Sequence, residues 1–583
     1  MARIDNLQDY INVASAKAAL LGNNDALAMK TAQELAALDQ HPPTDISVSI
    51  RDNYYRRKFE TPDYLHLEVD FPRLAIPTGK LILKGNDPAA DHVLNCDKTV
   101  VPVVIDLAPD EKGFGRLRWS GRVDVALDKF DGKQYTIECK LLHDKAWLTR
   151  IVAWVAWWMP IQIQGPPSRG IAFGGAVSVI KYIITSNVLR LQLGLWDLVN
   201  NLFSLNLDWR TWFRTALMFD PGEKLELRDI GRFITTPIYV VPTNPFFDTS
   251  PFISLDWRFD EILQLVNKTC EDNGLTIEVT LWEPGMPQPD ELSARLKLLQ
   301  VPTIVVDVKD RMQVTGFSGT FLDGIQRTFI DLIGSMFGEV LRPFLDPKNE
   351  AQYAPEGTNI APLLGLHFVK PWAVFTDHPR GGLKQFEFAH HHPIAWRTIT
   401  GGKSPKWMND FVDATLTWLI DMIMIVIGFT GIPGSILNGV FNDILLAFQL
   451  TDNFDRCQAL GPYGFPEKFV PTGSGSYTLE AFFQQKSAQW DTRGYVSAQV
   501  VVDNGYPYEL GRDIFPGALA TVIRRGKVFT DFIENAKLVD NRQQRASLTI
   551  QIGDGRAEEA PIAKIQRRLV DIQEGVNIVF MAQ

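Results

Sequence analysis

Three adjacent histidines, His390, His391 and His392, are the side chains in this 583-residue sequence with the most evident capacity to bind a metal. Imidazole is a common metal ligand, but a site needs several ligands that converge on one point. In a strand, successive side chains point to opposite faces, so three consecutive histidines do not converge readily. We therefore expect surface or structural roles for them; the alternative is a metal shared between subunits.

Other catalytic signals are absent from the sequence. It contains no HExxH, GxSxG, Walker or GxGxxG pattern in a supporting context, and its carboxylates are scattered. The four cysteines, Cys96, Cys139, Cys270 and Cys457, form no CxxC pair, so we expect reduced thiols. We predict no catalytic, cofactor-binding or metal-binding residues and no enzymatic activity. A Cys/His pair stays open, because members of a triad need not be close in sequence.

Composition limits the choice of partners. The net charge of -10 and the pI near 5.5 remove the usual electrostatic route to nucleic acid, so we expect no specific nucleic-acid binding. At 583 residues the chain is long enough for about three or four domains. The N-terminal residues MARIDNLQDY lack the pattern of a signal peptide, so we expect assembly in a host cytoplasm.

The most strongly patterned stretch lies between Gly115 and Pro160. Two alternating sets predict the strands of a hairpin with one buried face: Val123, Val125 and Leu127, then Tyr135, Ile137, Cys139 and Leu141. The apolar residues of both strands lie on the same side of the hairpin only if the loop has three residues. We therefore predict a loop at residues 130–132, in which Leu127 faces Tyr135. Gly132 would take the left-handed conformation.

After the hairpin, four tryptophans fall within twelve residues. Trp147, Ile151, Trp154 or Val155, and Trp158 recur at helical spacing, so we predict a helix that Asp144 caps and Pro160 ends. Its aromatic side is expected in a domain core, the alternative being a face for a partner subunit.

The remaining patterns predict an α+β multidomain protein with two strand-rich, barrel-like or sandwich-like regions, α/β insertions and apolar helical hairpins. In the α/β unit, the helix of WRFDEILQLVNKTC places Phe259, Ile262, Leu263 and Val266 on one face and stops at Asn273-Gly274. VNIVF near the C-terminus reads as a strand. The expected divisions are a helical segment at 1–45, a first barrel-like domain at 46–145, a Trp-rich helical insertion at 146–235, an α/β domain at 236–316, apolar helices with intervening strands at 317–477, and part of a second barrel-like domain at 478–583.

Two apolar helical regions are the candidate subunit interface. In the first, Phe321, Ile325, Phe329, Leu332, Met336 and Val340 form a stripe at helical spacing, with Asp323 and Arg327 elsewhere on the helix. The second, 407–450, reads as a helical hairpin that includes Trp418, Ile425 and Leu445. Its uninterrupted apolar run, 422–429, is shorter than the roughly 20 residues that a bilayer requires, so we expect packing against protein, with membrane contact as the alternative. The candidate interface residues are Phe321, Ile325, Phe329, Met336, Trp418, Ile425 and Leu445.

Several segments, in this order, resemble the large minor tail proteins of actinobacteriophages and related long-tailed siphoviruses, which group with tail-hub proteins. They are 119–154, SNVLRLQLGLWDL at 186–198, 318–331, 399–410, 526–538 and 547–554. The resemblance extends from about residue 46 to the C-terminus.

This resemblance implies a non-enzymatic, structural protein of the virion tail tip, or baseplate hub, that continues the tail tube and takes part in host attachment and DNA ejection. Related hubs are homotrimers in which two barrel-like domains per chain form a pseudo-sixfold ring. The implied partners are a distal tail ring protein, a tape measure protein, other minor tail proteins and the host envelope. The rival hypotheses are a tail-associated cell-wall hydrolase and a receptor-binding or membrane-contacting tip protein.

Overall fold

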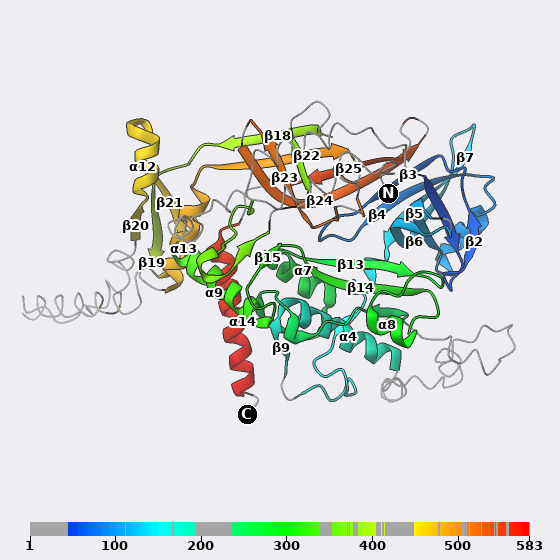
Figure 1. The fold of residues 1–583 in the computed structure, drawn as a ribbon, viewed down its shortest axis with the longest axis horizontal. Coiled ribbons are helices and arrows are strands. Elements are labelled where there is room, and N and C mark those ends of the chain that lie inside the picture. The colour runs from blue at the N-terminus through cyan, green and yellow to red at the C-terminus, as the bar shows by residue number, and fades with distance from the viewer. Residues whose placement is uncertain are drawn as a thin grey trace, which may run out of the picture.

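The computed structural model describes residues 45–581, except for 194–235, 338–352, 377–382, 404–447 apart from 410 and 413, and shorter gaps at 111, 166–167, 370, 372, 476–478, 504–507, 509, 512–513, 526, 542, 544–545 and 556–558. A 13-stranded sheet dominates the described chain, and a smaller α/β unit packs on one side of it (Figure 1). The predicted helices at 1–45 and nearly all of the 407–450 hairpin, with Trp418, Ile425 and Leu445, lie outside the described residues.

The N-terminal strands form as predicted. In the two strands between residues 66 and 84, one side chain in two enters a core that includes Leu67, Val69, Leu81 and Leu83, all fully buried. The six consecutive residues from Pro102 to Leu107, by contrast, are all buried. The strands are β1 (Ile46–Arg51), β2 (Arg57–Glu60), β3 (His66–Asp70), β4 (Thr78–Lys84), β5 (Pro102–Pro109), β6 (Gly115–Phe130) and β7 (Tyr135–His143), with the short helix α3 (Ala90–Leu94) between β4 and β5.

The β6–β7 hairpin forms, but its predicted loop and register are wrong. Phe130 pairs with Tyr135 across residues 131–134, and Leu127 faces Glu138. Gly132 has the expected positive φ, +88°. The two apolar faces are reconciled by a bulge between Val123 and Val125, which changes the register.

The C-terminal strands join the same sheet. They are β22 (Tyr495–Asp503), β23 (Leu519–Arg524), β24 (Lys527–Asn541) and β25 (Ser547–Ile552), with β17 (Ala373–Thr376) and β18 (Leu383–His391). β24 pairs antiparallel with β3, Leu538 opposite Val69, so strands from both ends of the sequence share one sheet and one core (Figure 1). The architecture is sheet-rich with helices, as predicted. The described pairings run on an open path from β2 to β18 and close no barrel.

The predicted tryptophan helix is wrong. His143, not Asp144, caps a 3-10 turn, η2 (Asp144–Thr149), and the chain then extends into β8 (Val152–Ala153). Long-range partners hold it there: β8 pairs with β12 (Asp260–Glu261), and Trp154 N–H donates to Asn187 Oδ1 at 3.0 Å. These contacts replace the local hydrogen bonds of a helix.

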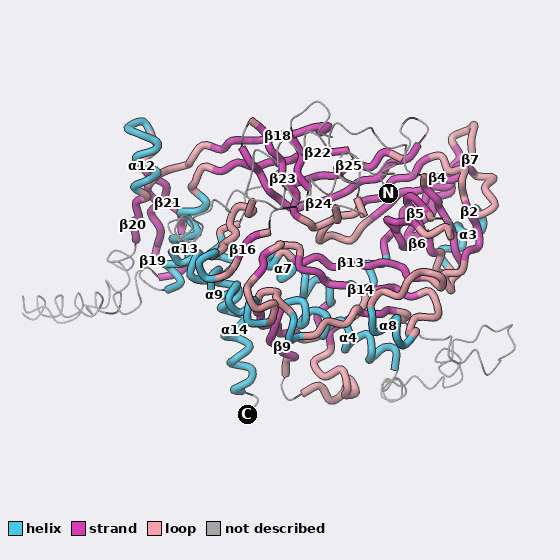
Figure 2. The backbone as a smooth tube through the Cα atoms, viewed as in Figure 1, coloured by secondary structure: helices cyan, strands magenta, loops and turns pink. Residues whose placement is uncertain are grey.

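The α/β unit has its own core and agrees largely with the prediction. It contains β9 (Gly170–Gly175), α4 (Ala176–Leu193), β10 (Ile238–Val240), β11 (Phe252–Trp257), α7 (Ile262–Asn273), β13 (Leu275–Trp282), α8 (Glu291–Leu296) and β14 (Thr303–Asp310). Figure 2 shows α4 and α7 beside β13 and β14. α7 ends at Gly274, φ +64°. Phe259 is a correction: it precedes the helix, with φ +61°, and is partly exposed.

Further elements lie outside the large sheet. They are η3 (Pro245–Phe247), β15 (Val314–Thr315), α9 (Phe321–Phe337), β16 (His367–Phe368), β19 (Arg397–Lys403), β20 (Phe448–Asp452), α12 (Phe454–Leu460), β21 (Glu467–Gly475), α13 (Leu479–Asp491) and α14 (Pro561–Met581). VNIVF, predicted as a strand, lies in α14, and Phe448 to Leu450, predicted as helical, lie in β20. Within the described part of the chain, every helix is too short or too polar to cross a bilayer.

Candidate subunit interface

The predicted interface stripe begins on α9, and its described residues face outward. Phe321, Ile325 and Phe329 are 38%, 41% and 56% exposed, and Leu322, which the sequence analysis missed, joins them. Met336 lies in α9 at a position whose side chain is not described. Three large apolar residues on successive turns thus form an outward face of the chain.

The opposite face of α9 is polar and points into the protein. The buried Asp323 carboxylate accepts hydrogen bonds from Ser318 Oγ at 2.7 Å and Gly319 N at 2.7 Å. Buried Arg327 forms an ion pair with Asp310 and donates to the Thr249 carbonyl at 3.0 Å. Ile330 is also buried on α9, so the inward side holds two charged residues and an apolar one, while three large apolar residues are left outside.

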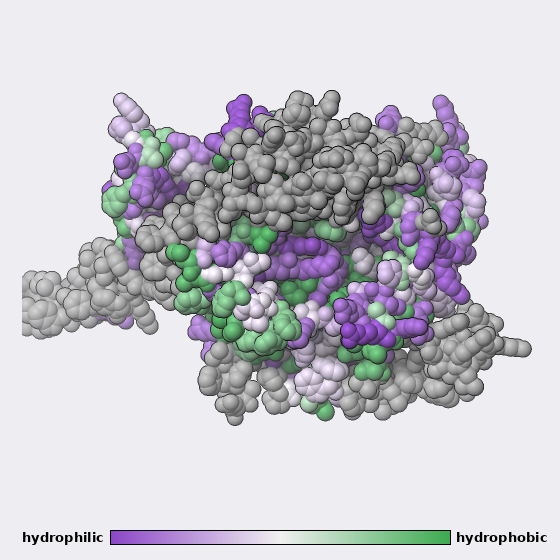
Figure 3. Space-filling view, in the orientation of Figure 1, coloured by the Kyte–Doolittle hydropathy of each residue, from purple (hydrophilic) through white to green (hydrophobic). Residues whose placement is uncertain are grey.

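A neighbouring turn extends this outward surface. Phe246 and Phe247 of η3 are exposed, and the Phe246 ring lies 5.9 Å from the Phe321 ring. Figure 3 shows hydrophobic side chains gathered over the part of the surface where α9 lies. We name Phe246, Phe247, Phe321, Leu322, Ile325 and Phe329 the α9 face. Exposed apolar patches of this kind mark sites of association.

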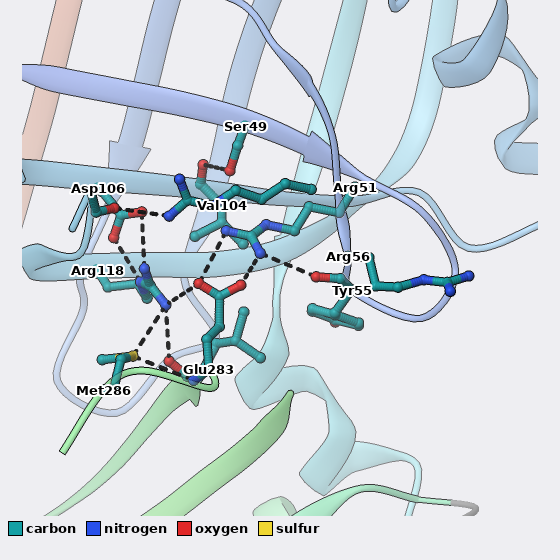
Figure 4. Close-up of polar contacts among 12 residues, drawn as sticks. Ser49, Arg51, Tyr55, Arg56, Val104, Asp106, Arg118, Glu283 and Met286 are labelled. Atoms are coloured by element: carbon teal, nitrogen blue, oxygen red, sulfur yellow. Dashed lines mark hydrogen bonds and ion pairs between the residues drawn. The ribbon is translucent and has the colours of Figure 1, made fainter. Parts of the chain in front are cut away.

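A buried charged cluster, which the sequence analysis also missed, joins the large sheet to the α/β unit (Figure 4). Arg118 of β6 binds Asp106 of β5 through Nε at 2.6 Å and Nη2 at 3.1 Å. The same guanidinium reaches Glu283, just after β13, at 2.9 Å. Arg51 of β1 binds Glu283 as well. The two positive and two negative charges therefore compensate each other in a region that is buried from solvent.

The charge states of this cluster fit a structural role. Burial, and then the positive charge of Arg118, lower the pKa of Arg51 to about 10, which leaves it charged at neutral pH. Both carboxylates are occupied by guanidinium groups, so neither is placed as a free acid or base. Sequence spacing carries no signal for this cluster, because Arg51, Arg118 and Glu283 are far apart in the chain.

A small pocket of about 70 Å³ between α7, α9 and α14 gathers several carboxylates. Asp272 binds Arg567 at 2.9 Å, Asp331 binds Arg568 at 3.0 Å, and Glu356 binds Arg493 at 2.9 Å. Each of these three carboxylates is ion-paired, and these ion pairs hold the elements around the pocket together. The fourth carboxylate that lines it, Glu271, is paired with Lys268 at 2.8 Å.

The three histidines lie at the end of β18 and diverge. His391 stacks on Tyr495 at 4.2 Å and approaches Ser497 Oγ at 3.1 Å, whereas His392 meets the edge of Phe465. In the described ranges, no three His, Cys, Asp or Glu side chains are grouped to hold a metal ion. The cysteines are unbridged. Cys139 and Cys270 are buried, which raises the pKa of each thiol to about 12.

The chain is similar to several known proteins. The chain is 23% identical to the Minor tail protein Gp28 of Mycobacterium phage D29 over 67% of this chain and 70% of that protein, and equally similar to its namesake in Mycobacterium phage L5. Solved structures that align with it include a tail protein from Neisseria meningitidis MC58, with 10% identity, 87% of this chain, 96% of that chain and a TM-score of 0.34. The 43 kDa tail protein of prophage MuSo2 from Shewanella oneidensis also aligns, with 9% identity, 89% of this chain, 99% of that chain and a TM-score of 0.34.

The family match spans most of the chain. Residues 47–554 match the family described as Siphovirus ReqiPepy6 Gp37-like protein. This range contains the large sheet, the α/β unit and the α9 face. The expected relationship to siphovirus minor tail proteins is thus confirmed, and the chain belongs to the Siphovirus ReqiPepy6 Gp37-like protein family.

Proposed function

We propose that this protein is a structural minor tail protein at the tail-tip hub of a long-tailed phage. There it continues the tail tube and takes part in host attachment and DNA delivery. The family match over residues 47–554 and the similarity to minor tail proteins of two mycobacteriophages support this function. Its partners would be a distal tail ring protein, a tape measure protein and other minor tail proteins, within the virion.

The strand-rich halves at 46–145 and 478–583 would be the two tube modules of each chain, arranged as a homotrimer. Their shared sheet supports this, because it leaves edge strands: β2 and β18 at the two ends of the main path, and β17 off that path, each pair with one neighbour among the described strands. An edge strand offers unpaired N–H and C=O groups. Contact between one end and the opposite end of the next chain is heterologous, and such contacts generate a closed ring when the rotation between neighbours closes, as a trimer requires.

The orientation of α9 is the main observation that supports the proposed homotrimer. Two of its charged residues, Asp323 and Arg327, are buried and bonded to other parts of the chain, while Phe321, Ile325 and Phe329 face solvent in the single chain. Burial of a large aromatic side chain is worth about 1.5–3 kcal/mol, so covering this face favours association strongly. In our proposal a neighbouring protomer covers it.

Mass photometry of the purified protein tests this assembly. We expect particles of about three times 65.7 kDa for the wild type and monomers for Phe329→Asp, because a carboxylate in the contact would be desolvated without a partner. Phe130→Asp is the matched control: Phe130 at the hairpin tip is also 56% exposed, and this variant should remain trimeric. A wild-type protein that stays monomeric at micromolar concentration would contradict the proposal.

A further inference from the structure

The small sheet of β19, β20 and β21 has an apolar face. Figure 1 shows this sheet at the left end of the described chain, apart from the large sheet. Its pairings place Leu450 of β20 and Phe469 of β21 on either side of Ile399 of β19. Phe448 lies two residues before Leu450, and its ring is 5.9 Å from the ring of Phe469. These four side chains therefore share one face. We name Ile399, Phe448, Leu450 and Phe469 the β20 face.

The opposite face of this sheet is already covered. Thr398 and Thr400 of β19 are buried, and α13 packs against β19 and β21 on their side. On the β20 face, by contrast, Phe448, Leu450 and Phe469 are 50%, 53% and 46% exposed. Among the described elements, the helix that packs on this sheet thus covers its polar side and leaves the apolar side open.

The apolar surface at this end of the molecule is large enough for a contact between proteins. Phe454, Tyr463 and Phe465, in the connection from β20 to β21, are exposed as well. Together with the β20 face they expose on the order of 700 Å², since a fully exposed aromatic side chain presents about 200 Å². On the same basis the α9 face exposes on the order of 600 Å². A stable interface buries about 800 Å² on each partner, so both areas are close to what one contact requires.

The α9 face and the β20 face are also compatible in shape and charge. A helix with an apolar stripe and a sheet with an apolar face pack on each other as layers in protein cores. Arg397, at one end of the β20 face, is bound by Asp452 at 2.6 Å and by Glu467 at 3.0 Å. Asp323 and Arg327 are bound on the opposite side of α9. Contact between the two faces would therefore leave none of these charged groups without its partner.

We propose that the α9 face of one chain packs on the β20 face of a second copy. This inference rests on the homotrimer proposed above and names the surface that the α9 face meets. In a ring of three chains, a patch away from the symmetry axis contacts a different patch of the next chain. The small sheet then lies between two helices, with its own α13 on the polar side and the neighbour's α9 on the apolar side.

Cysteine cross-linking of the full-length protein tests this contact. The partly buried Cys96 and Cys457 are first replaced by serine. Phe329→Cys and Leu450→Cys are then introduced together, and a short bis-maleimide joins thiols that lie close to each other in the assembled protein. We expect covalent dimers and trimers on a denaturing gel. Each single variant should give none, because every chain then offers a thiol on only one of the two faces.

The loop between β8 and β9 provides a matched control. Ile163 in this loop is also exposed, and Phe329→Cys combined with Ile163→Cys should not cross-link. In mass photometry, Leu450→Asp should weaken association by about tenfold or more, because a carboxylate would be desolvated in the contact. Ile163→Asp should associate as the wild type does.

The possible results distinguish this contact from the trimer itself. A trimeric double variant without the link between Phe329→Cys and Leu450→Cys would overturn the contact and leave the homotrimer standing. Linking through Phe329→Cys alone, which would place three α9 faces at the symmetry axis, would overturn it too, as would linking to Ile163→Cys instead. Normal association of Leu450→Asp would mean that another occupant, such as the segment 404–447 of the same chain, covers the β20 face. A monomeric wild-type protein would contradict the homotrimer and this contact together.

Discussion

At the scale of single residues, His143 is a group whose protonation is linked to folding. It is buried at the end of β7, and its Nδ1 accepts a hydrogen bond from Lys145 N at 3.0 Å. Burial, and then the charge of Lys145, lower the pKa of His143 to about 3. The unfolded chain binds a proton here near pH 6.5, whereas the folded chain does not. Stability is therefore complete above about pH 6.5 and falls as pH decreases toward 3.

The substitution His143→Asn tests this linkage. The Asn side-chain oxygen can replace Nδ1 as the acceptor that caps the following turn, but it does not titrate. We expect the free energy of unfolding to fall less steeply below pH 6.5 in the variant, by up to about 1.4 kcal/mol per pH unit. Urea denaturation at several pH values between 4 and 7 measures the slopes. Equal slopes in both proteins would show that another group controls acid stability.

At the scale of elements, the bulge in β6 decides which side chains reach the core. Val123 is buried opposite Leu141, but Val125, two residues on, lies opposite Lys140 and is exposed. Without a bulge, residues two apart in a strand share a face. The extra residue thus separates two valines that the alternating pattern places together.

A matched pair of substitutions tests the bulge. Val→Thr keeps the shape of the side chain and adds one hydroxyl group. At buried Val123 we expect a loss of about 1–3 kcal/mol in the free energy of unfolding, because the hydroxyl is desolvated. At Val125 we expect a change within about 0.5 kcal/mol. Chemical denaturation of both variants gives the comparison, and equal losses would mean that both valines face the core.

At the scale of the whole molecule, the cluster of Arg51, Asp106, Arg118 and Glu283 connects the large sheet to the α/β unit. Glu283 binds both arginines, and it is the member of the cluster that the α/β unit supplies. Removing one partner of a buried ion pair leaves the other charge without compensation. The junction should therefore be sensitive to the charge of this one carboxylate.

Glu283→Gln should lower the free energy of unfolding by about 3 kcal/mol or more. The control is Glu291→Gln on α8, where the pair with Arg295 spans 3.6 Å and both side chains are exposed. Pairs of that kind contribute little, so we expect no measurable change. Thermal and denaturant unfolding of both variants provide the measurement. A Glu283→Gln protein as stable as the control would show that the cluster is not needed to hold the two parts together.

The sequence by itself determined those features that depend on neighbouring residues. Alternating side chains specified β3, β4, β22 and β25, and Gly274 ended α7 because a left-handed residue suits glycine. The ordered segments that resemble minor tail proteins also indicated the family. These signals are local, or are carried by residue identity alone, and need no knowledge of distant contacts.

Only the tertiary structure decided features that depend on partners far away in the chain. The tryptophan segment is extended because Asn187 and Trp257 bind its backbone, and the two strand-rich halves form one sheet because β24 pairs with β3. α9 turns its aromatic side outward because Asp310 and the Thr249 carbonyl bind Arg327 on the opposite side. A helical pattern shows that a helix has two faces, but the groups that meet each face determine which of them is buried.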